Sequence, residues 1–352
     1  MDRMHIGGMF PLERPLPVQT GFFSNRGEDL RFFLSGRCAL YTCLLDTGIQ
    51  DRRNVAYVPA YTCETVLSSY EKAGFTLRFY DIKKTDLSPM WKLSDLAGVS
   101  VLNVCGYYGF SRYDHQFLEV CRREGILIVQ DITHSMFSVD GYYPFADYWA
   151  GSARKWMGIA SGGVAIKAKG RFNVPLLPPD PQHLAGRRLA MEYRRQAIEQ
   201  ADVQYDEQAT RVFWETEMRL RSMFDAFAGD PESEQILQSC DVTSLRAQRR
   251  ENYQTLLSHY HASGACTALF PELDPDSCPS HFTFYSEDRE QTQAKLAAWG
   301  IKSTVYWPVP PMLDQMTYPS ASWIYEHVLS VQIDQRYHTS EMEYLAAMLS
   351  RL

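Results

Sequence analysis

Short apolar runs alternate with amphipathic segments along the first half of the chain. The runs have the length and composition of buried strands, and the segments between them have the spacing of helices. The predicted strands are residues 54–58, 76–80, 100–104, 126–130 and 164–167. Because these strands are apolar throughout and alternate with helices, they predict a parallel sheet with helices on both faces.

The second half of the chain has a different order of elements. A long helical region is expected at residues 184–227, where Arg and Glu are frequent, as on solvated helix faces. A further amphipathic helix is expected at 244–261. Strands and helices then alternate in the order strand, helix, strand, strand, helix, which predicts a compact α+β domain. These last elements are expected at 282–285, 290–299, 303–307, 328–333 and from residue 340. We therefore expect an N-terminal arm (1–30), a large domain (31–240) and a small C-terminal domain (241–352).

Composition narrows the class of protein. The 352 residues carry a formal net charge of −7, which gives no general reason to expect nucleic acid or an anionic membrane as partner. No apolar run reaches the roughly 18 residues of a membrane-spanning helix. The N-terminus lacks the continuous apolar core of a signal peptide, and the eight cysteines include no C-x-x-C pair. We expect a cytoplasmic protein without a metal site.

The segment around Lys155 carries the first candidate chemistry. Ser152 stands three residues before this lysine, Trp156 and Met157 follow it, and a run of small residues ends at Gly163. Apolar neighbours disfavour the ammonium form, so such a lysine can act as a nucleophile towards a carbonyl group. A surface lysine beside a packed tryptophan is the alternative on local grounds.

Two other segments place polar groups where ligands bind. Asp131 ends an apolar strand, and His134 follows it; ligands of parallel sheets lie at the carboxyl ends of the strands. The turn from Ser35 to Cys38 opens a helix, and a helix N-terminus favours a phosphate group. An ordinary helix cap is the alternative for both Asp131 and Ser35.

Seven motifs in order along the chain resemble the DegT/DnrJ/EryC1/StrS family of fold type I pyridoxal phosphate (PLP) aminotransferases. The glycine-containing turn S-G-R-C-A-L, the strand end V-P-A-Y-T and the segment Q-D-I-T-H-S match three of the family's motifs. Lys155 is followed by Gly162 and Gly163 at the family's spacing. The remaining matches are R-R-E-N-Y (249–253), V-Y-W-P-V-P (305–310) and L-S-V-Q-I (329–333).

This resemblance implies a PLP-dependent aminotransferase of fold type I. Lys155 would form the aldimine with the cofactor, and Asp131 would pair with its ring nitrogen, which would lower the pKa of the Asp131 carboxyl. His134 would lie near the cofactor as a third catalytic residue. The implied cofactor-binding residues are Gly36, Arg37, Cys38, Cys63, Asp131, His134, Ser152 and Lys155.

The family also implies the reaction partners. An amino donor such as glutamate or glutamine would convert the cofactor to pyridoxamine phosphate. A keto acceptor would then receive the amino group. In the family this acceptor is a nucleotide-linked keto-sugar of polysaccharide biosynthesis. A homodimer is implied as well. A lyase or decarboxylase using PLP, or a PLP-binding regulatory protein without turnover, are the alternatives.

Three positions depart from the family pattern. The family serine usually stands five residues before the lysine, where this chain has Ala150, and Ser152 stands three before. Where the family has an aromatic ring against the cofactor, this chain has Cys63, so either Cys63 or Tyr61 is expected to face the ring. Trp307 replaces a small or aromatic polar residue of the family, so the resemblance does not carry the family's sugar specificity over to this chain.

Overall fold

The computed structural model describes residues 5–17, 21–24, 26–50, 53–262 and 266–352. Within these residues the larger sheet has eight strands in the order β1-β8-β7-β6-β5-β2-β3-β4. Their bounds are β1 (Asp29–Phe33), β2 (Val55–Pro59), β3 (Thr76–Ile82), β4 (Pro89–Met90), β5 (Val101–Cys105), β6 (Leu127–Asp131), β7 (Tyr148–Ser152) and β8 (Gly163–Lys167). The five strands from β7 to β3 are parallel to one another, and β8, β1 and β4 join antiparallel.

Both faces of this sheet are buried, as the apolar strands predict. Ile128 and Val129 are neighbours in β6, yet they belong to two separate hydrophobic clusters on opposite faces. The covering helices include α1 (Gly36–Gln50), α2 (Glu64–Lys72) and α3 (His115–Arg123). Asp114 caps α3 by accepting hydrogen bonds from the backbone of Gln116 and Phe117.

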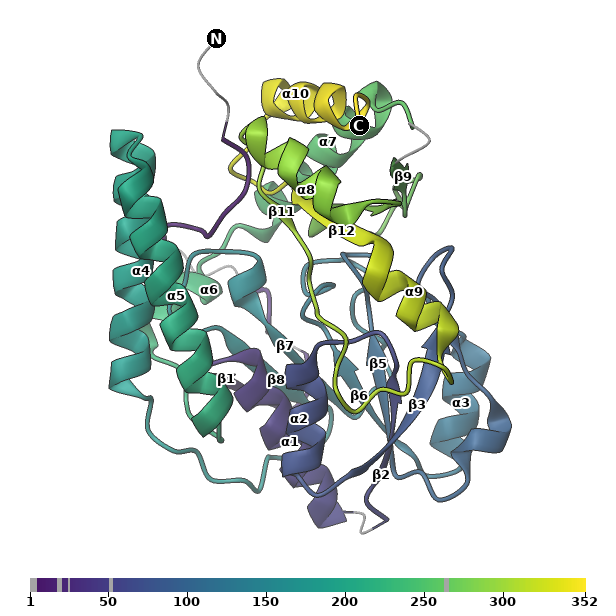
Figure 1. The fold of residues 1–352 in the computed structure, drawn as a ribbon. Helices are drawn as coiled ribbons and strands as arrows, with labels where there is room; N and C mark the ends of the chain where they lie inside the picture. Colours follow the sequence, from purple (N-terminus) through teal and green to yellow (C-terminus); the bar gives the residue numbers. More distant parts are fainter. Residues whose placement is uncertain (1–4, 18–20, 25, 51–52, 263–265) are drawn as a thin grey trace.

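A smaller antiparallel sheet of four strands lies beyond the large one (Figure 1). Its order is β11-β12-β10-β9. The strands are β9 (Cys266–Ala268), β10 (His281–Ser286), β11 (Ser303–Thr304) and β12 (Val328–Gln332). Helices α7 (Val242–His259), α8 (Arg289–Ala298) and α10 (Thr339–Leu349) gather around this sheet, and α9 (Pro319–His327) lies towards the large one. The chain thus has a large mostly parallel α/β part and a smaller C-terminal α+β part.

Helices α4 (Pro181–Gln200) and α5 (Val203–Met223) form a long antiparallel hairpin along one flank of the molecule (Figure 1). Asp180, which caps α4, also pairs with Arg219 of α5 at 2.7 Å. Gly186 allows close packing, because a Cβ atom there would lie 2.7 Å from a methyl group of Thr216. The short helix α6 (Pro231–Gln238) follows.

The described part of the N-terminal arm packs on its own chain. Ile6 forms a parallel bridge with Ile301 beside the small sheet. Farther along, the backbone N–H of Glu13 donates to the carbonyl oxygen of Gly158 at 2.8 Å. The arm therefore connects the small sheet to the loop that follows Lys155. Residues 1–4, 18–20 and 25 of the expected arm lie outside the described residues.

The structure differs from the sequence predictions in several elements. The expected helical region at 184–227 is two helices, because Ala201 has a left-handed backbone (φ 52°) that ends α4. The expected strand at 303–307 has only two residues, since the chain turns away towards the large sheet before Pro308. Strands β1, β4, β7 and β9 and helices α6 and α9 were not predicted. In the described residues no helix is long and apolar enough to cross a membrane.

Candidate active site

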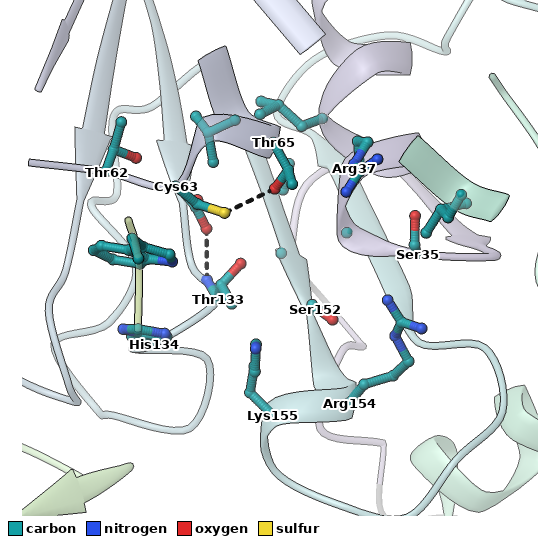
Figure 2. A pocket seen from close by; sticks show the side chains of 18 of the residues that line it. Ser35, Arg37, Thr62, Cys63, Thr65, Thr133, His134, Ser152, Arg154 and Lys155 are labelled. Atoms are coloured by element: carbon teal, nitrogen blue, oxygen red, sulfur yellow. Dashed lines mark hydrogen bonds between the residues drawn. The ribbon is translucent and has the colours of Figure 1, made fainter. Parts of the chain in front are cut away.

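A cavity of about 210 Å³ lies at the carboxyl ends of the parallel strands. Its walls come from the ends of β5, β6 and β7, the first turns of α1 and α2, the hairpin α4–α5 and the segment after β11. Figure 2 shows side chains from these separate segments pointing into one space. The cavity contains seven of the eight residues that the sequence singled out as cofactor-binding: Gly36, Arg37, Cys63, Asp131, His134, Ser152 and Lys155.

Lys155 ends the short turn η2 (Ala153–Lys155) that follows β7, and its side chain stands in the cavity (Figure 2). Desolvation lowers the pKa of its ammonium group, because protein surrounds the cavity. The exposed surface of Lys155 faces the cavity, so water in the cavity limits the fall in the pKa of Lys155. The centre of the Tyr306 ring lies 5.3 Å from the Lys155 nitrogen. Lys155 is an accessible amine in a partly desolvated site.

Asp131 is the last residue of β6, and its carboxylate is 9% exposed. One oxygen accepts a hydrogen bond from the backbone N–H of Thr133 at 2.8 Å. Burial raises the pKa of this carboxyl group, and no basic side chain of the described residues forms an ion pair with it. For Asp131 paired with a cation, the sequence predicts a lowered pKa instead. The pKa is raised here because the chain itself supplies no such cation.

His134 forms the side of the cavity next to Lys155. Its ring stacks on Trp307 with 5.5 Å between centres and 9° between planes. Desolvation and the nearby Lys155 lower the pKa of His134 to about 3, so the imidazole is neutral at physiological pH. Its Nδ1 atom is buried and has no hydrogen-bond partner among the described residues. His134 can therefore pack against a ligand and exchange a hydrogen bond with it.

The turn at the start of α1 forms the opposite end of the cavity. Ser35 caps the helix by accepting from the backbone N–H of Cys38 at 3.2 Å. Gly36 packs on β7 so closely that a Cβ atom would lie 2.8 Å from that of Ser152. Ser152 makes no capping hydrogen bond with the turn that it precedes. The absence of a side chain at Gly36 lets the first turn of α1 pack directly against β7, so that this helix N-terminus and Ser152 line the same end of the cavity, as an anion site requires.

Of three other residues that the sequence places near the cofactor, one lines the cavity and two do not. Cys63 is the N-cap residue of α2, lines the cavity and contacts the hydroxyl of Thr65 at 3.0 Å (Figure 2). Tyr61 is fully buried among other aromatic rings and does not line the cavity. Cys38 is not in the cavity either: its side chain points into the core, because the third residue of α1 faces the sheet. Only the backbone of Cys38 belongs to the turn.

The cavity also contains charged residues that the sequence analysis missed. Arg154 lies between Ser152 and Lys155, and Arg187 and Glu217 come from α4 and α5. Both arginines approach the same oxygen of Glu217, at 3.4 Å from Arg154 and 3.1 Å from Arg187. The frequency of Arg and Glu in residues 184–227 predicts solvated helix faces, and the local pattern contains no signal that separates a buried arginine from an exposed one.

Comparisons with known proteins establish the fold. No protein-family model and no curated protein matches this chain. Among solved structures, an aminotransferase described as DegT DnrJ EryC1 StrS from Brucella abortus superposes with a TM-score of 0.65 at 15% identity, over 96% of this chain and 91% of that one. A protein from Streptococcus pneumoniae described as a sugar aminotransferase, in its PLP form, gives 0.69 at 17% identity over 99% and 98%.

A third similar structure is Helicobacter pylori PseC, an aminotransferase of pseudoaminic acid biosynthesis. It superposes with a TM-score of 0.69 at 13% identity, over 99% of each chain. The likeness extends over nearly the whole length of this chain and of its neighbours. It confirms the predicted fold, and at these identities the residues of the site have to support the function by themselves.

Proposed function

We propose that this protein is a PLP-dependent aminotransferase. One observation carries the proposal: Lys155, Asp131 and an open helix N-terminus converge on a single cavity. These are the three groups that PLP requires, namely an amine for its aldehyde, a carboxylate for its ring nitrogen and an anion site for its phosphate. The neighbours of the same fold include sugar aminotransferases in PLP form, which supports this choice.

The residues present fit the cofactor. Asp131 is a buried carboxylate for which the described chain supplies no cation, and a protonated ring nitrogen would supply one. Gly36 brings the start of α1 against Ser152, and both residues line the cavity, where a phosphate group would meet the backbone N–H groups of the helix N-terminus. Lys155 points into the same cavity, between Thr133 and Ser152 in the view of Figure 2. We assign Gly36, Arg37 and Ser152 to the phosphate, Asp131 to the ring nitrogen and Lys155 to the aldehyde.

When bound, PLP supplies an aldehyde that condenses with amines and a protonated ring that withdraws electrons from the adjoining carbon. The chain supplies the rest. Lys155, when its Nζ atom is neutral, can take a proton from a substrate carbon and return it. The Asp131 carboxylate would stabilise the positive charge of the ring nitrogen at its end of the cavity. His134, neutral and stacked on Trp307, would cover one side of the site together with Cys63.

The substrates follow from the fold and the chemistry. We propose glutamate or glutamine as amino donor and a keto-sugar, nucleotide-linked, as acceptor, because proteins of this fold from S. pneumoniae and H. pylori are described as acting in sugar metabolism. Trp307, in the segment after β11, lines the cavity and stacks on His134, where it would contact the acceptor. A cytoplasmic homodimer with roles in polysaccharide biosynthesis is part of the same proposal.

The experiment follows PLP by visible absorbance. Purified protein is loaded with PLP, and glutamate or glutamine is added without acceptor. Before the donor is added, we expect the visible absorbance band of a protein-bound imine. The donor should replace it by the shorter-wavelength band of pyridoxamine phosphate. Lys155→Ala should abolish the first band. Lys169→Ala, a lysine just beyond β8 with an exposed side chain, is the matched control and should behave as the unchanged protein.

The outcomes separate the alternatives. A band that no amino donor changes would favour a PLP-binding protein without turnover. Release of CO2 without formation of pyridoxamine phosphate would point to a decarboxylase. A spectrum that Lys155→Ala leaves unchanged would show that the cofactor is bound elsewhere and would overturn the assignment of Lys155.

A further inference from the structure

A group of buried charges lies where the α4–α5 hairpin meets the cavity. Glu217 of α5 is shared by Arg154 of η2 and Arg187 of α4, through the 3.4 and 3.1 Å contacts described above. Arg187 is held in place by the close packing of α4 on α5 at Gly186. None of these three residues belongs to a motif of the sequence analysis, and the assignment of PLP above uses none of them.

The arginines have more hydrogen-bond donors than the chain satisfies. The side chains of Arg187 and Arg154 are only 4% and 11% exposed. Nevertheless Nε of Arg187 and Nε of Arg154 are buried and lack a hydrogen-bond acceptor among the described residues. Nε of Arg37, on the first turn of α1, is in the same condition. Nη1 of Arg154 has the 3.4 Å ion-pair contact with Glu217 but no hydrogen bond within these residues. Buried donors of charged groups are nearly always paired, so these nitrogens indicate a missing anionic partner.

The balance of charge describes that partner. Although burial opposes ionisation of Glu217, Arg154, Arg187, Lys155 and Arg37 lower its pKa to about 2, so Glu217 is an anion at neutral pH. Burial and the neighbouring Arg154 lower the pKa of Arg187 to about 9, which still leaves Arg187 charged. Three guanidinium groups and one carboxylate leave two positive charges. A phosphate dianion balances them, whereas a single carboxylate leaves one positive charge uncompensated.

The position of these groups agrees with a phosphate. Figure 2 shows that the Arg154 side chain points towards the end of the cavity that holds Ser35 and Arg37. This is the end at which the N-terminus of α1 opens beside Gly36 and Ser152. A phosphate there would meet backbone N–H groups and hydroxyls on one side and guanidinium groups on the other.

We propose that Arg154 and Arg187, oriented by Glu217, form an arginine clamp that binds a phosphate dianion against the N-terminus of α1. The proposal rests on the proposed function, in which this phosphate belongs to the cofactor. The clamp gives the α4–α5 hairpin a role: it closes the phosphate end of the cavity with residues of the same chain. Arg154 and Arg187 are binding residues in this arrangement, and Glu217 is a positioning residue.

The test compares PLP with pyridoxal, which lacks the phosphate. Dissociation constants are measured by quenching of tryptophan fluorescence in a Lys155→Ala background, so that only non-covalent contacts contribute; Trp307 in the cavity wall is the reporter. We expect PLP to bind at least about 100-fold more tightly than pyridoxal, since hydrogen bonds between charged partners are the stronger class. Arg187→Met and Arg154→Met should each reduce this ratio by about tenfold or more, with little change for pyridoxal.

Arg195→Met is the matched control. Arg195 lies on the same helix, α4, but it is exposed and pairs with Glu192 and Glu199 on the surface. Its replacement should leave the ratio unchanged. Arg187→Lys keeps the charge but loses the planar donor pair, so we expect an intermediate ratio. Glu217→Gln should change the ratio while the pyridoxal constant stays the same.

A second measurement needs neither activity nor cofactor. Inorganic phosphate should raise the melting temperature of the unchanged protein and compete with PLP, and it should do both less effectively in Arg187→Met. Circular dichroism would reveal whether Arg187→Met folds. If it does not, the phosphate measurement still tests the clamp, because phosphate can be titrated into the unchanged protein and into Arg187→Lys.

The results distinguish the clamp from the proposed function. If PLP binds and donors convert it, yet the ratio is the same in all arginine variants, the clamp is overturned and the function stands. If Arg187→Met raises only the KM for the amino donor, the arginine binds a substrate carboxylate and the clamp is likewise overturned. If PLP does not bind at all, the proposed function fails, and the phosphate titration alone then supports or overturns the clamp.

Discussion

The side-chain nitrogen of Lys155 lies 5.3 Å from the centre of the Tyr306 ring. The ring belongs to the segment after β11 of the small sheet, whereas the lysine follows β7 of the large sheet, so this contact joins the two parts of the molecule at the cavity. The hydroxyl oxygen of Tyr306 lies 2.6 Å from Nε2 of buried His281, which fixes the orientation of the ring. An aromatic face near a cation favours the charged form of the lysine.

Replacement of Tyr306 should therefore change the reactivity of Lys155. Tyr306→Leu removes a cation–π contact of about 0.5–2 kcal/mol, so the pKa of Lys155 should fall further and its labelling at neutral pH should become faster. Tyr306→Phe keeps the ring and should resemble the unchanged protein. The measurement is the pH dependence of reductive methylation of Lys155, followed by mass spectrometry. Equal labelling of all three proteins would show that the ring has no electrostatic role.

Gly36→Ala should impair the anion site. The added Cβ atom would lie 2.8 Å from that of Ser152, so the first turn of α1 has to move away from β7 at a cost of about 1–3 kcal/mol. PLP affinity should fall at least about tenfold, since the backbone N–H groups then lose their position. Fluorescence titration and urea unfolding measure the two effects.

Gly48→Ala is the control for this substitution. Gly48 lies on the same helix, and a Cβ atom there would meet nothing within 4 Å. Alanine is the better helix former by about 1 kcal/mol, so stability should stay the same or rise slightly. Loss of PLP affinity in the Gly48 variant as well would contradict a specific role for Gly36.

Three buried histidines should make the protein sensitive to acid. Burial lowers the pKa of His134 and His183 to about 3 each and that of His281 well below its usual range. The unfolded chain takes up these protons below about pH 6.5 and the native chain does not, so stability falls as the pH decreases. Each histidine contributes about 1.4 kcal/mol per pH unit near pH 5.

Urea unfolding at pH 5, 6 and 7 measures this slope. His183→Leu removes one of the three groups and should make the dependence on pH less steep by about 1.4 kcal/mol per unit. His183 is suited to the test because neither ring nitrogen has a hydrogen-bond partner among the described residues. His115→Leu, at an exposed position on α3, should leave the slope as it is. An unchanged slope in His183→Leu would contradict the burial argument.

Breaking the ion pair between Asp46 and Lys167 should be strongly destabilising. The pair joins α1 to β8 at 2.6 Å, and the aspartate side chain is fully buried. Lys167→Met would leave the buried carboxylate with only the hydroxyl of Tyr148 and a backbone N–H, at a cost of about 3–5 kcal/mol. The double variant Asp46→Asn/Lys167→Met should recover much of this loss. Urea unfolding tests both, and additive losses would contradict a pairwise interaction.

Local patterns in the sequence determined the parallel part of the fold and one side of the site. Buried strands such as β6 are continuous apolar runs, and hydrophobicity alone marks them. Because parallel strands present their carboxyl ends at one edge, the end of β6 was sufficient to place Asp131 at the ligand-binding edge. Lys155 was placed beside it only by the family resemblance, since β7, the strand before Lys155, was not predicted. The turn at Gly36 was identified from local residue types as well.

The tertiary structure alone decided the remaining features. Strand β7, with its sequence Y-W-A-G-S, has weak strand propensity, and pairing with β6 and β8 supplies what the local residues lack. Arg187 and Glu217 lie thirty residues apart on helices that resemble solvated ones, and only the packing of α4 on α5 turns these two residues towards the cavity. Burial of a charge depends on what packs against it, and that information is absent from the spacing of residues along a single helix.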